Sequence, residues 1–430
     1  WSQTWSASST AHAIGGQNYT SYDLAASMAN PDLKWETTIT RNLGIDFAVL
    51  DSRLSGSADL YWNTTKDLLM NVTIPGITGF TSTFANIGQT SNKGVELALN
   101  AVLVQTKDWG LNMSANINFN RNNIDALAEN VSTQYGSSWF HSGNPGNDYV
   151  FQVGMPVGLV QGLQYDGWYT ADDFTYANGV YTLKPGVPDL SSNITGVFHG
   201  AENRVPKGQN AYPGMVKFKD VDGSGTVDAK DYEVIGDMNP LFTGGFNINA
   251  NYKNWDLGLY FNYSVGNQIY NINKLVSLNG YKETGVYENH LALLKDSYKL
   301  YDIDKNGQLF RLEEPSDLDA ANVNANFPLF YNENGIVSNL GIEDGSYLRL
   351  NTLTLGYTLP SVSKFAKALS ISSLRVYATA YNVFTLTKYS GLDPEVSTNN
   401  NMNANYPTPG IDYGAYPRAR SFVLGVNVSF

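Results

Sequence analysis

Long stretches of this sequence alternate between apolar and small polar residues. Within 109–119 every odd position is apolar, and every even position is Gly, Asn or Ser. A period of two gives a β-strand one apolar face and one polar face. The same alternation predicts nine strands, at residues 43–49, 55–63, 95–103, 109–119, 245–251, 256–265, 348–359, 374–384 and 422–430.

The connections between these strands differ sharply in length. Three are short turns, at 50–55, 104–109 and 252–255, and a fourth, at 358–373, is somewhat longer and holds a helical stretch at 363–369. The others are long, at 70–92, 122–239, 267–342 and 385–418. Short turns on one side and long loops on the other are typical of an outer-membrane β-barrel, whereas a soluble sandwich has more even connections.

Composition narrows the class of protein. Asn, Gly and Ser dominate the polar faces, and charged residues make up only 15% of the chain. The wet lumen of a barrel fits these residues better than the solvated face of a sandwich does. The 39 acidic and 27 basic residues give a net charge of −12, which argues against nucleic-acid binding. With no Cys and four scattered His, the chain shows no catalytic constellation, so we do not expect an enzyme.

Two hypotheses from different classes follow. The first is an all-β, antiparallel transmembrane β-barrel with long extracellular loops. The second is a soluble, all-β, calcium-stabilised surface protein that binds glycans. Aromatic residues near the strand ends favour the barrel, because lipid-facing bands end in aromatic girdles. These residues are Trp35, Trp62, Trp109, Trp255 and Tyr357.

Five strings, in order along the chain, resemble the C-terminal half of SusC/RagA-type TonB-dependent outer-membrane transporters. They are NPDLKWET at 30–37, SNKGVEL at 91–97, GDMNPLFTGG at 236–245, YLRLNTLTLGYTLP at 347–360 and YNVFTLTKYSGLDPE at 381–395. Each string alone is a weak signal. Their order, and the aromatic residue that closes the last strand, make the resemblance specific.

The resemblance implies the C-terminal portion, about nine to eleven strands, of a barrel of about 22 strands in the outer membrane of a Gram-negative bacterium. It also implies an N-terminal plug, a TonB–ExbB–ExbD energy-coupling complex and a lipoprotein lid of the SusD type. Such pairs import oligosaccharides or peptides. The chain begins at Trp1 and shows no signal peptide, plug or TonB box. We therefore expect it to begin inside a longer protein, to which import belongs.

We expect the chain to consist of four parts. Residues 1–33 are expected to form a loop, and 34–121 the first strands. Residues 122–239 are expected to form a long extracellular loop with a calcium-like motif. Residues 240–430 hold the C-terminal strands and their loops.

The sharpest local motif lies at 220–231, with the sequence DVDGSGTVDAKD. Oxygen-bearing residues stand at the spacings of a calcium-binding loop, and Gly225 stands where such a loop turns sharply. The predicted ligands are Asp220, Asp222, Ser224, Thr226 (through its carbonyl), Asp228 and Asp231. Related transporters carry a similar string just before G-x-x-x-P. The alternative is an Asp- and Gly-rich turn held by its own hydrogen bonds.

A second, weaker match lies at 302–313, with the sequence DIDKNGQLFRLE. Its candidate calcium ligands are Asp302, Asp304, Asn306, Gln308 and Glu313. Phe310 occupies one of the ligand positions and cannot bind a cation. A solvated turn is the alternative here.

Aromatic residues in the long loops are candidates for contact with a ligand. A flat ring suits the apolar face of a sugar, although rings in loops also serve packing. The candidates are Trp139, Phe140, Trp168, Tyr169 and Tyr406.

Overall fold

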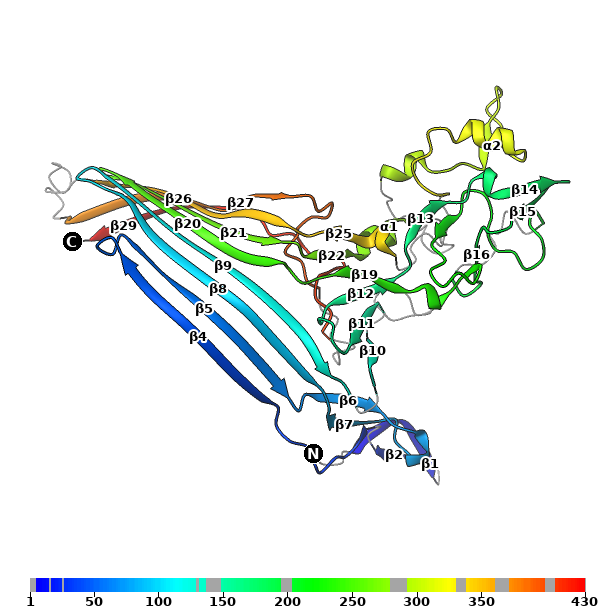
Figure 1. Cartoon of the computed structure of the whole chain (residues 1–430), viewed down its shortest axis with the longest axis horizontal. Coiled ribbons are helices and arrows are strands. Elements are labelled where there is room, and N and C mark those ends of the chain that lie inside the picture. The colour runs from blue at the N-terminus through cyan, green and yellow to red at the C-terminus, as the bar shows by residue number, and fades with distance from the viewer. Residues whose placement is uncertain are drawn as a thin grey trace.

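The computed structural model is dominated by one large antiparallel sheet (Figure 1). The structure describes residues 5–14, 17–24, 27–128, 131–136, 148–194, 203–278, 292–329, 338–359, 371–398 and 407–429. Within them, the nine predicted strands are confirmed, and each neighbours the strand expected of a meander. In sheet order they are β4 (Thr37–Val49), β5 (Leu54–Lys66), β8 (Gln89–Gln105), β9 (Trp109–Ala126), β20 (Phe242–Tyr252), β21 (Trp255–Val265), β26 (Tyr347–Leu359), β27 (Ser373–Thr387) and β29 (Ser421–Ser429).

The register places the apolar residues of neighbouring strands side by side. Leu43 pairs with Leu60, Leu60 with Val95, and Val95 with Phe119. This face has no protein cover among the described residues: Leu99 is 47% exposed and Leu424 is 85% exposed. Exposed apolar surface costs about 25 cal/mol per Å² in water, so a continuous apolar face of this size needs lipid against it.

An aromatic row crosses the sheet beside the short turns. Trp109 pairs with Tyr252, Tyr252 with Trp255, and Trp255 with Tyr357. The Trp109 and Tyr252 ring centroids are 4.3 Å apart, and those of Trp255 and Tyr357 are 4.8 Å apart. Rings that are apolar at one end and polar at the other suit the membrane–water boundary. The row therefore marks one edge of the lipid-facing band.

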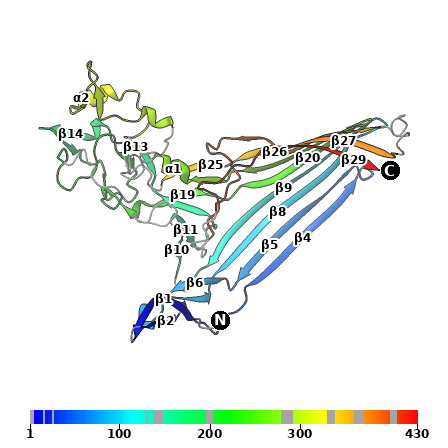
Figure 2. The ribbon, with the colours of Figure 1, turned by 180° about the vertical axis from the view of Figure 1, so that it is seen from behind.

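The two ends of the sheet differ as the connection lengths predicted. The short turns and the end of β29 lie at one end, and the long connections lie at the other (Figures 1 and 2). The sheet is open: β4 and β29 are its edges, and neither has a second partner strand among the described residues. The chain thus forms part of a barrel wall. The predicted helical stretch at 363–369 lies outside the described residues.

The long connections form smaller elements at the far end of the sheet (Figure 1). One four-stranded sheet has the order β10 (Thr133–Gly136), β11 (Tyr149–Gln152), β12 (Leu159–Gly162) and β19 (Glu233–Asp237). A three-stranded sheet has the order β25 (Ile342–Asp344), β22 (Gln268–Asn271) and β28 (Ile411–Asp412). Paired strands are β13 (Tyr165–Trp168) with β17 (Val216–Phe218), β14 (Phe174–Ala177) with β15 (Val180–Leu183), β16 (Asp189–Leu190) with β18 (Thr226–Val227), and β23 (Tyr301–Ile303) with β24 (Leu309–Arg311).

Short helices complete this region. Among the described residues, the α-helices are α1 (Ile272–Leu278) and α2 (Pro315–Ala321). The 3₁₀ helices found there are η1 (Gly76–Thr78), η2 (Ala171–Asp173), η4 (Ala229–Asp231), η5 (Ala292–Asp296) and η6 (Asn339–Gly341). No helix in the described part of the chain combines the length and the apolarity that a membrane span requires.

The segment 122–239 is not the irregular loop that its length suggested. It packs with the next long connection around a buried core that includes Tyr169, Tyr212, Phe218, Tyr298 and Leu318. A second core joins the end of β9 to later loops and includes Ile124, Tyr149, Val160, Tyr270 and Ile411. The described strands of this region belong to their own small sheets, so the described part of the segment adds no strand to the nine of the main sheet.

The expectation of a simple loop at 1–33 is corrected as well. β1 (Trp5–Ile14) and β2 (Gln17–Leu24) form an antiparallel hairpin. β3 (Ser27–Met28) joins β7 (Ser82–Asn86), which also pairs with β6 (Leu69–Thr73). Small residues such as Ser, Ala and Thr dominate 5–14, so this part of the sequence lacks the alternation of apolar and polar residues that predicts a strand.

Candidate functional site

The polar face of the sheet carries its own hydrogen-bond network. Arg375 holds Asp256 with two hydrogen bonds, of 2.9 Å from Nε and 2.5 Å from Nη2. Asn and Thr side chains link further strands, such as Asn247 to Ser114 and Thr354 to Thr379. A concavity of about 500 Å³ lies over these strands, and Tyr260 and Arg375 are among its lining residues. A wall dominated by amides and hydroxyls suits a water-filled passage for polar solutes.

A buried ion network lies at the loop end of this polar face. Arg349, on β26, is only 3% exposed and lies opposite Asn262 of β21. Its Nη2 is 2.5 Å from Asp393 Oδ1, and its Nη1 is 3.0 Å from Glu395 Oε2. Arg418 Nη1 approaches the same Glu395 oxygen at 3.1 Å. Two segments of the connection between β27 and β29 are thereby fixed to the barrel wall.

Neutral donors complete the coordination of Glu395. The Tyr347 hydroxyl and the Asn262 amide donate to its Oε1, at 2.8 and 3.1 Å. Burial acts to raise the pKa of Asp393, but hydrogen bonds from the Glu395 backbone and from Arg349 outweigh it and hold that pKa below its usual value. Asp393 therefore stays ionised at neutral pH, in a network that sets two guanidinium groups against two carboxylates.

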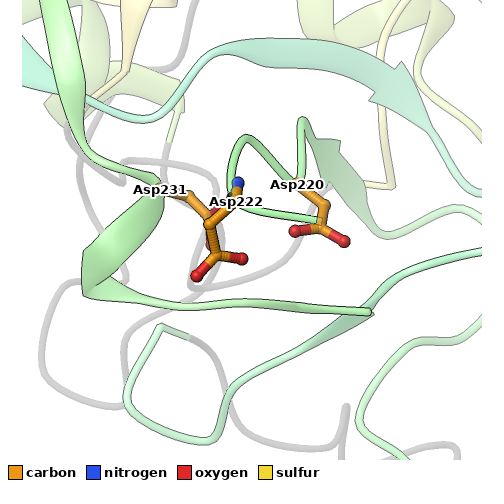
Figure 3. A group of neighbouring side chains, drawn as sticks. All are labelled: Asp220, Asp222 and Asp231. Carbon is orange, nitrogen blue, oxygen red and sulfur yellow. Dashed lines mark hydrogen bonds between the residues drawn. The ribbon is translucent and has the colours of Figure 1, made fainter. Parts of the chain in front are cut away.

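In the first calcium-like loop, three of the six predicted ligands converge (Figure 3). Asp220, Asp222 and Asp231 each bring a carboxylate oxygen within 4.8 Å of the others, the one such cluster among the described residues. Asp231 is fully buried, and its carboxylate accepts hydrogen bonds from the backbone N–H groups of Val221 and Asp228, both at 2.7 Å. The loop is therefore folded around one buried carboxylate.

The remaining groups of this loop are engaged in different ways. The Asp228 carboxylate caps η4 by accepting from the Lys230 N–H at 2.7 Å, and it does not belong to the cluster. The Ser224 hydroxyl donates to the Thr226 carbonyl at 3.0 Å. Hydrogen bonds from the Ser224 side chain and backbone lower the pKa of Asp222 below its usual value. The loop is thus ordered by its own hydrogen bonds, and the Asp222 carboxylate is ionised at neutral pH.

The second calcium-like loop is the turn of the β23–β24 hairpin. Asp304 accepts from the backbone N–H groups of Asn306 and Gln308, both at 2.8 Å. Glu313 points elsewhere, because it forms a 2.9 Å ion pair with Arg204. Asp302, Asp304 and Glu313 form no convergent cluster in the described part of the chain. Asp304 instead accepts the hydrogen bonds of the turn, as the alternative of a solvated turn expects, and calcium binding at this loop stays a prediction.

The five candidate aromatic residues have different outcomes. Tyr169 is wholly buried, and its hydroxyl donates to the Pro188 carbonyl at 2.7 Å, so it packs the loop core and presents no surface to a ligand. Trp168 is partly buried against the same core. Trp139, Phe140 and Tyr406 lie outside the described residues.

The Arg349 network was not predicted from the sequence, although Arg349, Asp393 and Glu395 all lie in the strings that carry the family resemblance. The arginine is the one charge in YLRLNTLTLGYTLP, and the two carboxylates belong to the DPE of YNVFTLTKYSGLDPE. A single charge on the polar side of an otherwise neutral strand was the available signal, because a buried charge demands a partner.

The family model described as TonB dependent receptor-like, β-barrel matches residues 1–263. The chain is 28% identical over 428 residues to TonB-dependent receptor P3 of Formosa agariphila, covering 98% of this chain and 37% of that protein. It is 28% identical over 405 residues to TonB-dependent receptor SusC of Bacteroides thetaiotaomicron, covering 93% of this chain and 32% of that protein. The chain therefore spans about a third of the length of these relatives.

Among solved structures, the chain resembles one titled as the RagAB peptide transporter. The TM-score is 0.68 and the identity is 25%, over 99% of this chain and 38% of that chain. A RagAB peptide importer in a closed state is similar to the same degree, with a TM-score of 0.68.

Proposed function

The chain belongs to the family of TonB dependent receptor-like β-barrels, which are outer-membrane proteins of Gram-negative bacteria, and from this we propose that it builds part of the wall of a nutrient importer. The observation that carries this proposal is the division of one nine-stranded sheet into an apolar face, without cover from the described residues, and a polar face rich in amides and hydroxyls. Lipid against the first face and water against the second give a transmembrane passage. The relatives are named as receptors, which agrees with the expectation of a protein that is not an enzyme.

The substrate is an oligosaccharide or a peptide, and the importer works with a SusD-like lipoprotein lid and the TonB–ExbB–ExbD complex. The similarity to SusC and to the RagAB peptide transporter supports this pairing. In this arrangement the short turns face the periplasm and the folded loop region faces the outside. The second hypothesis, a soluble glycan-binding protein, is disfavoured by the exposed apolar face and by the family.

Deletion of the gene tests import. We expect the mutant to lose growth on one class of oligosaccharide or peptide as sole carbon source, and expression of the intact gene to restore it. Unchanged uptake of every such nutrient would contradict import. A tag inserted at the turn around Gly186 should be labelled on intact cells, and labelling only after permeabilisation would reverse the proposed orientation.

We also propose that Asp220, Asp222 and Asp231, with the Thr226 carbonyl, bind one structural Ca²⁺. Hard oxygen ligands suit this ion, and the three carboxylates already converge. Calcium outside the cell is millimolar, so weak affinity suffices there. A crystal of the whole receptor grown with Ca²⁺ should show an ion about 2.3–2.6 Å from these oxygens. The absence of such density would contradict the proposal and would mean that hydrogen bonds within the loop hold it without an ion.

A further inference from the structure

A cavity of about 820 Å³ lies among α1, β25 and the connection between β27 and β29. Its lining includes Lys274 of α1, Glu343 of β25, Asp412 of β28, and Leu392 and Tyr416 from the connection. This volume is typical of sites for small molecules, which are concave and hold a few convergent polar groups.

The ion network around Arg349 fixes this cavity beside the polar face of the sheet. Leu392 precedes Asp393, whose carboxylate is bound by Arg349. Tyr416 stands two residues before Arg418, which pairs with Glu395. Glu395 in turn contacts Asn262 and Tyr347 on the polar face. The two segments that carry the exposed side chains of the cavity are therefore held in place, which reduces the entropy that a ligand must overcome.

The charged groups of the cavity already have partners. Lys274 Nζ lies 3.0 Å from Glu343 Oε1, and the Ser390 backbone N–H donates to Glu343 Oε2 at 2.9 Å. Asp412 accepts from the Asn273 amide at 2.8 Å and from the Tyr389 hydroxyl at 2.6 Å. A ligand with a full charge, such as a peptide terminus, would have to displace one of these partners.

These groups nevertheless keep hydrogen-bonding capacity. An ammonium group has three donors and a side-chain amide nitrogen has two, and each carboxylate oxygen can accept more than one hydrogen bond. Lys274, Asn273 and Asp412 together offer spare donors and acceptors side by side. A hydroxyl both donates and accepts, so vicinal hydroxyl groups match such a mixed set.

Apolar side chains line the cavity beside these polar groups. Tyr416 is 92% exposed and Leu392 is 76% exposed. A pyranose ring has an apolar face, which suits the ring of Tyr416, and an edge of hydroxyl groups, which suits Lys274 and Asp412. We propose that this cavity binds a neutral sugar unit of an oligosaccharide, with Tyr416 as the stacking surface and Asp412, Asn273 and Lys274 as hydrogen-bonding partners. The inference rests on the proposed import function and names the substrate class within it.

The test uses the whole receptor, purified in detergent, and isothermal titration calorimetry. The probes are neutral hexasaccharides of glucose, xylose and mannose with several linkages, and a set of unlabelled hexapeptides. We expect at least one hexasaccharide to bind. Tyr416→Ala and Asp412→Asn should each weaken its binding about tenfold, which is about 1.4 kcal/mol. Tyr416→Phe should keep most of the affinity. Tyr301→Ala, which removes an exposed tyrosine of the β23–β24 hairpin outside the cavity, should change nothing.

Several outcomes would overturn the inference. One is that no hexasaccharide binds at millimolar concentration. Another is that hexapeptides alone bind and that Tyr416→Ala weakens them, which would assign the cavity to peptides. A third is that a hexasaccharide binds with unchanged affinity in both cavity variants. Failure here is distinct from failure of import, because growth of the deletion strain reports import whether or not Tyr416 takes part.

Discussion

Arg349 and Asp393 stand 44 residues apart in the chain, yet Arg349 Nη2 lies 2.5 Å from Asp393 Oδ1 in a buried pair. One partner belongs to a barrel strand, and the other belongs to the connection that follows β27. Removal of one member of a buried pair is costly, because the other charge is left in a site of low polarity. The pair therefore joins the wall of the barrel to the loop region at its mouth.

Replacement of Arg349 should release this connection. We expect Arg349→Met to destabilise the docked segments 389–398 and 407–418 by about 3–5 kcal/mol, because Asp393 loses its cation and Glu395 keeps only that of Arg418. Hydrogen exchange in the whole receptor should become faster in those segments and unchanged in β8 and β9. Arg375→Met, which breaks the more exposed pair with Asp256, serves as the control and should have a smaller effect. Unaltered exchange in Arg349→Met would contradict the role of the network.

The same network predicts a dependence on pH. The folded pKa of Asp393 lies below its ordinary value of 3.8, so its contribution to stability is present above pH 3.8 and is lost as the pH falls through the lower folded value. Hydrogen exchange within 389–398, corrected for the intrinsic exchange rate at each pH, should thus rise steeply only below about pH 4. Asp393→Asn should exchange faster already at pH 5, without that steep rise. A wild-type rise centred at pH 6 would point to a different group.

The first calcium-like loop should depend on its buried carboxylate. Asp231→Ala leaves the N–H groups of Val221 and Asp228 without their acceptor, at a cost of about 1–3 kcal/mol each where they stay buried. We expect faster proteolysis at 220–231, as for Asp220→Ala combined with Asp222→Ala, while the barrel remains folded. If Ca²⁺ binds, its addition should slow cleavage at 220–231 in the wild type and not in Asp231→Ala. Asp304→Ala in the second loop is the matched control, and Ca²⁺ should slow its cleavage at 220–231 as in the wild type.

The two free edges of the sheet predict the behaviour of these residues by themselves. Backbone groups of β4 and β29 would lack partners, and unpaired edges are not tolerated in lipid. Residues 1–430 expressed alone should aggregate or fail to insert into detergent micelles. A monomeric, heat-modifiable barrel formed by these residues alone would refute this prediction, and the same assay on the whole receptor provides the positive control.

The sequence predicted the large sheet because lipid and water impose a period of two on every strand. Leu111, Met113 and Ala115 alternate with asparagine and serine, and this alternation predicted β9. The strand extends to Ala126, but residues 120–123 are all polar, so the alternation did not predict this extension. The loop region was missed for a different reason. Its strands are two to five residues long, too short for a period, and Tyr169 and Tyr298 meet in its core from distant segments. Likewise, the spacing of Asp302 and Glu313 suggested a calcium loop, whereas the distant Arg204 decided where Glu313 points.

The central claim is that the sheet spans a membrane with one face toward lipid. Residues 1–430 contain no cysteine. Single cysteines can therefore be placed at 244–251 of β20 in the whole receptor, where each carries a spin label. The account predicts that accessibility to oxygen peaks at even positions such as Ile248, and that accessibility to a water-soluble nickel reagent is higher at odd positions such as Asn247. High accessibility to the nickel reagent at every position, with no alternation between even and odd positions, would contradict the claim that one face of the sheet meets lipid.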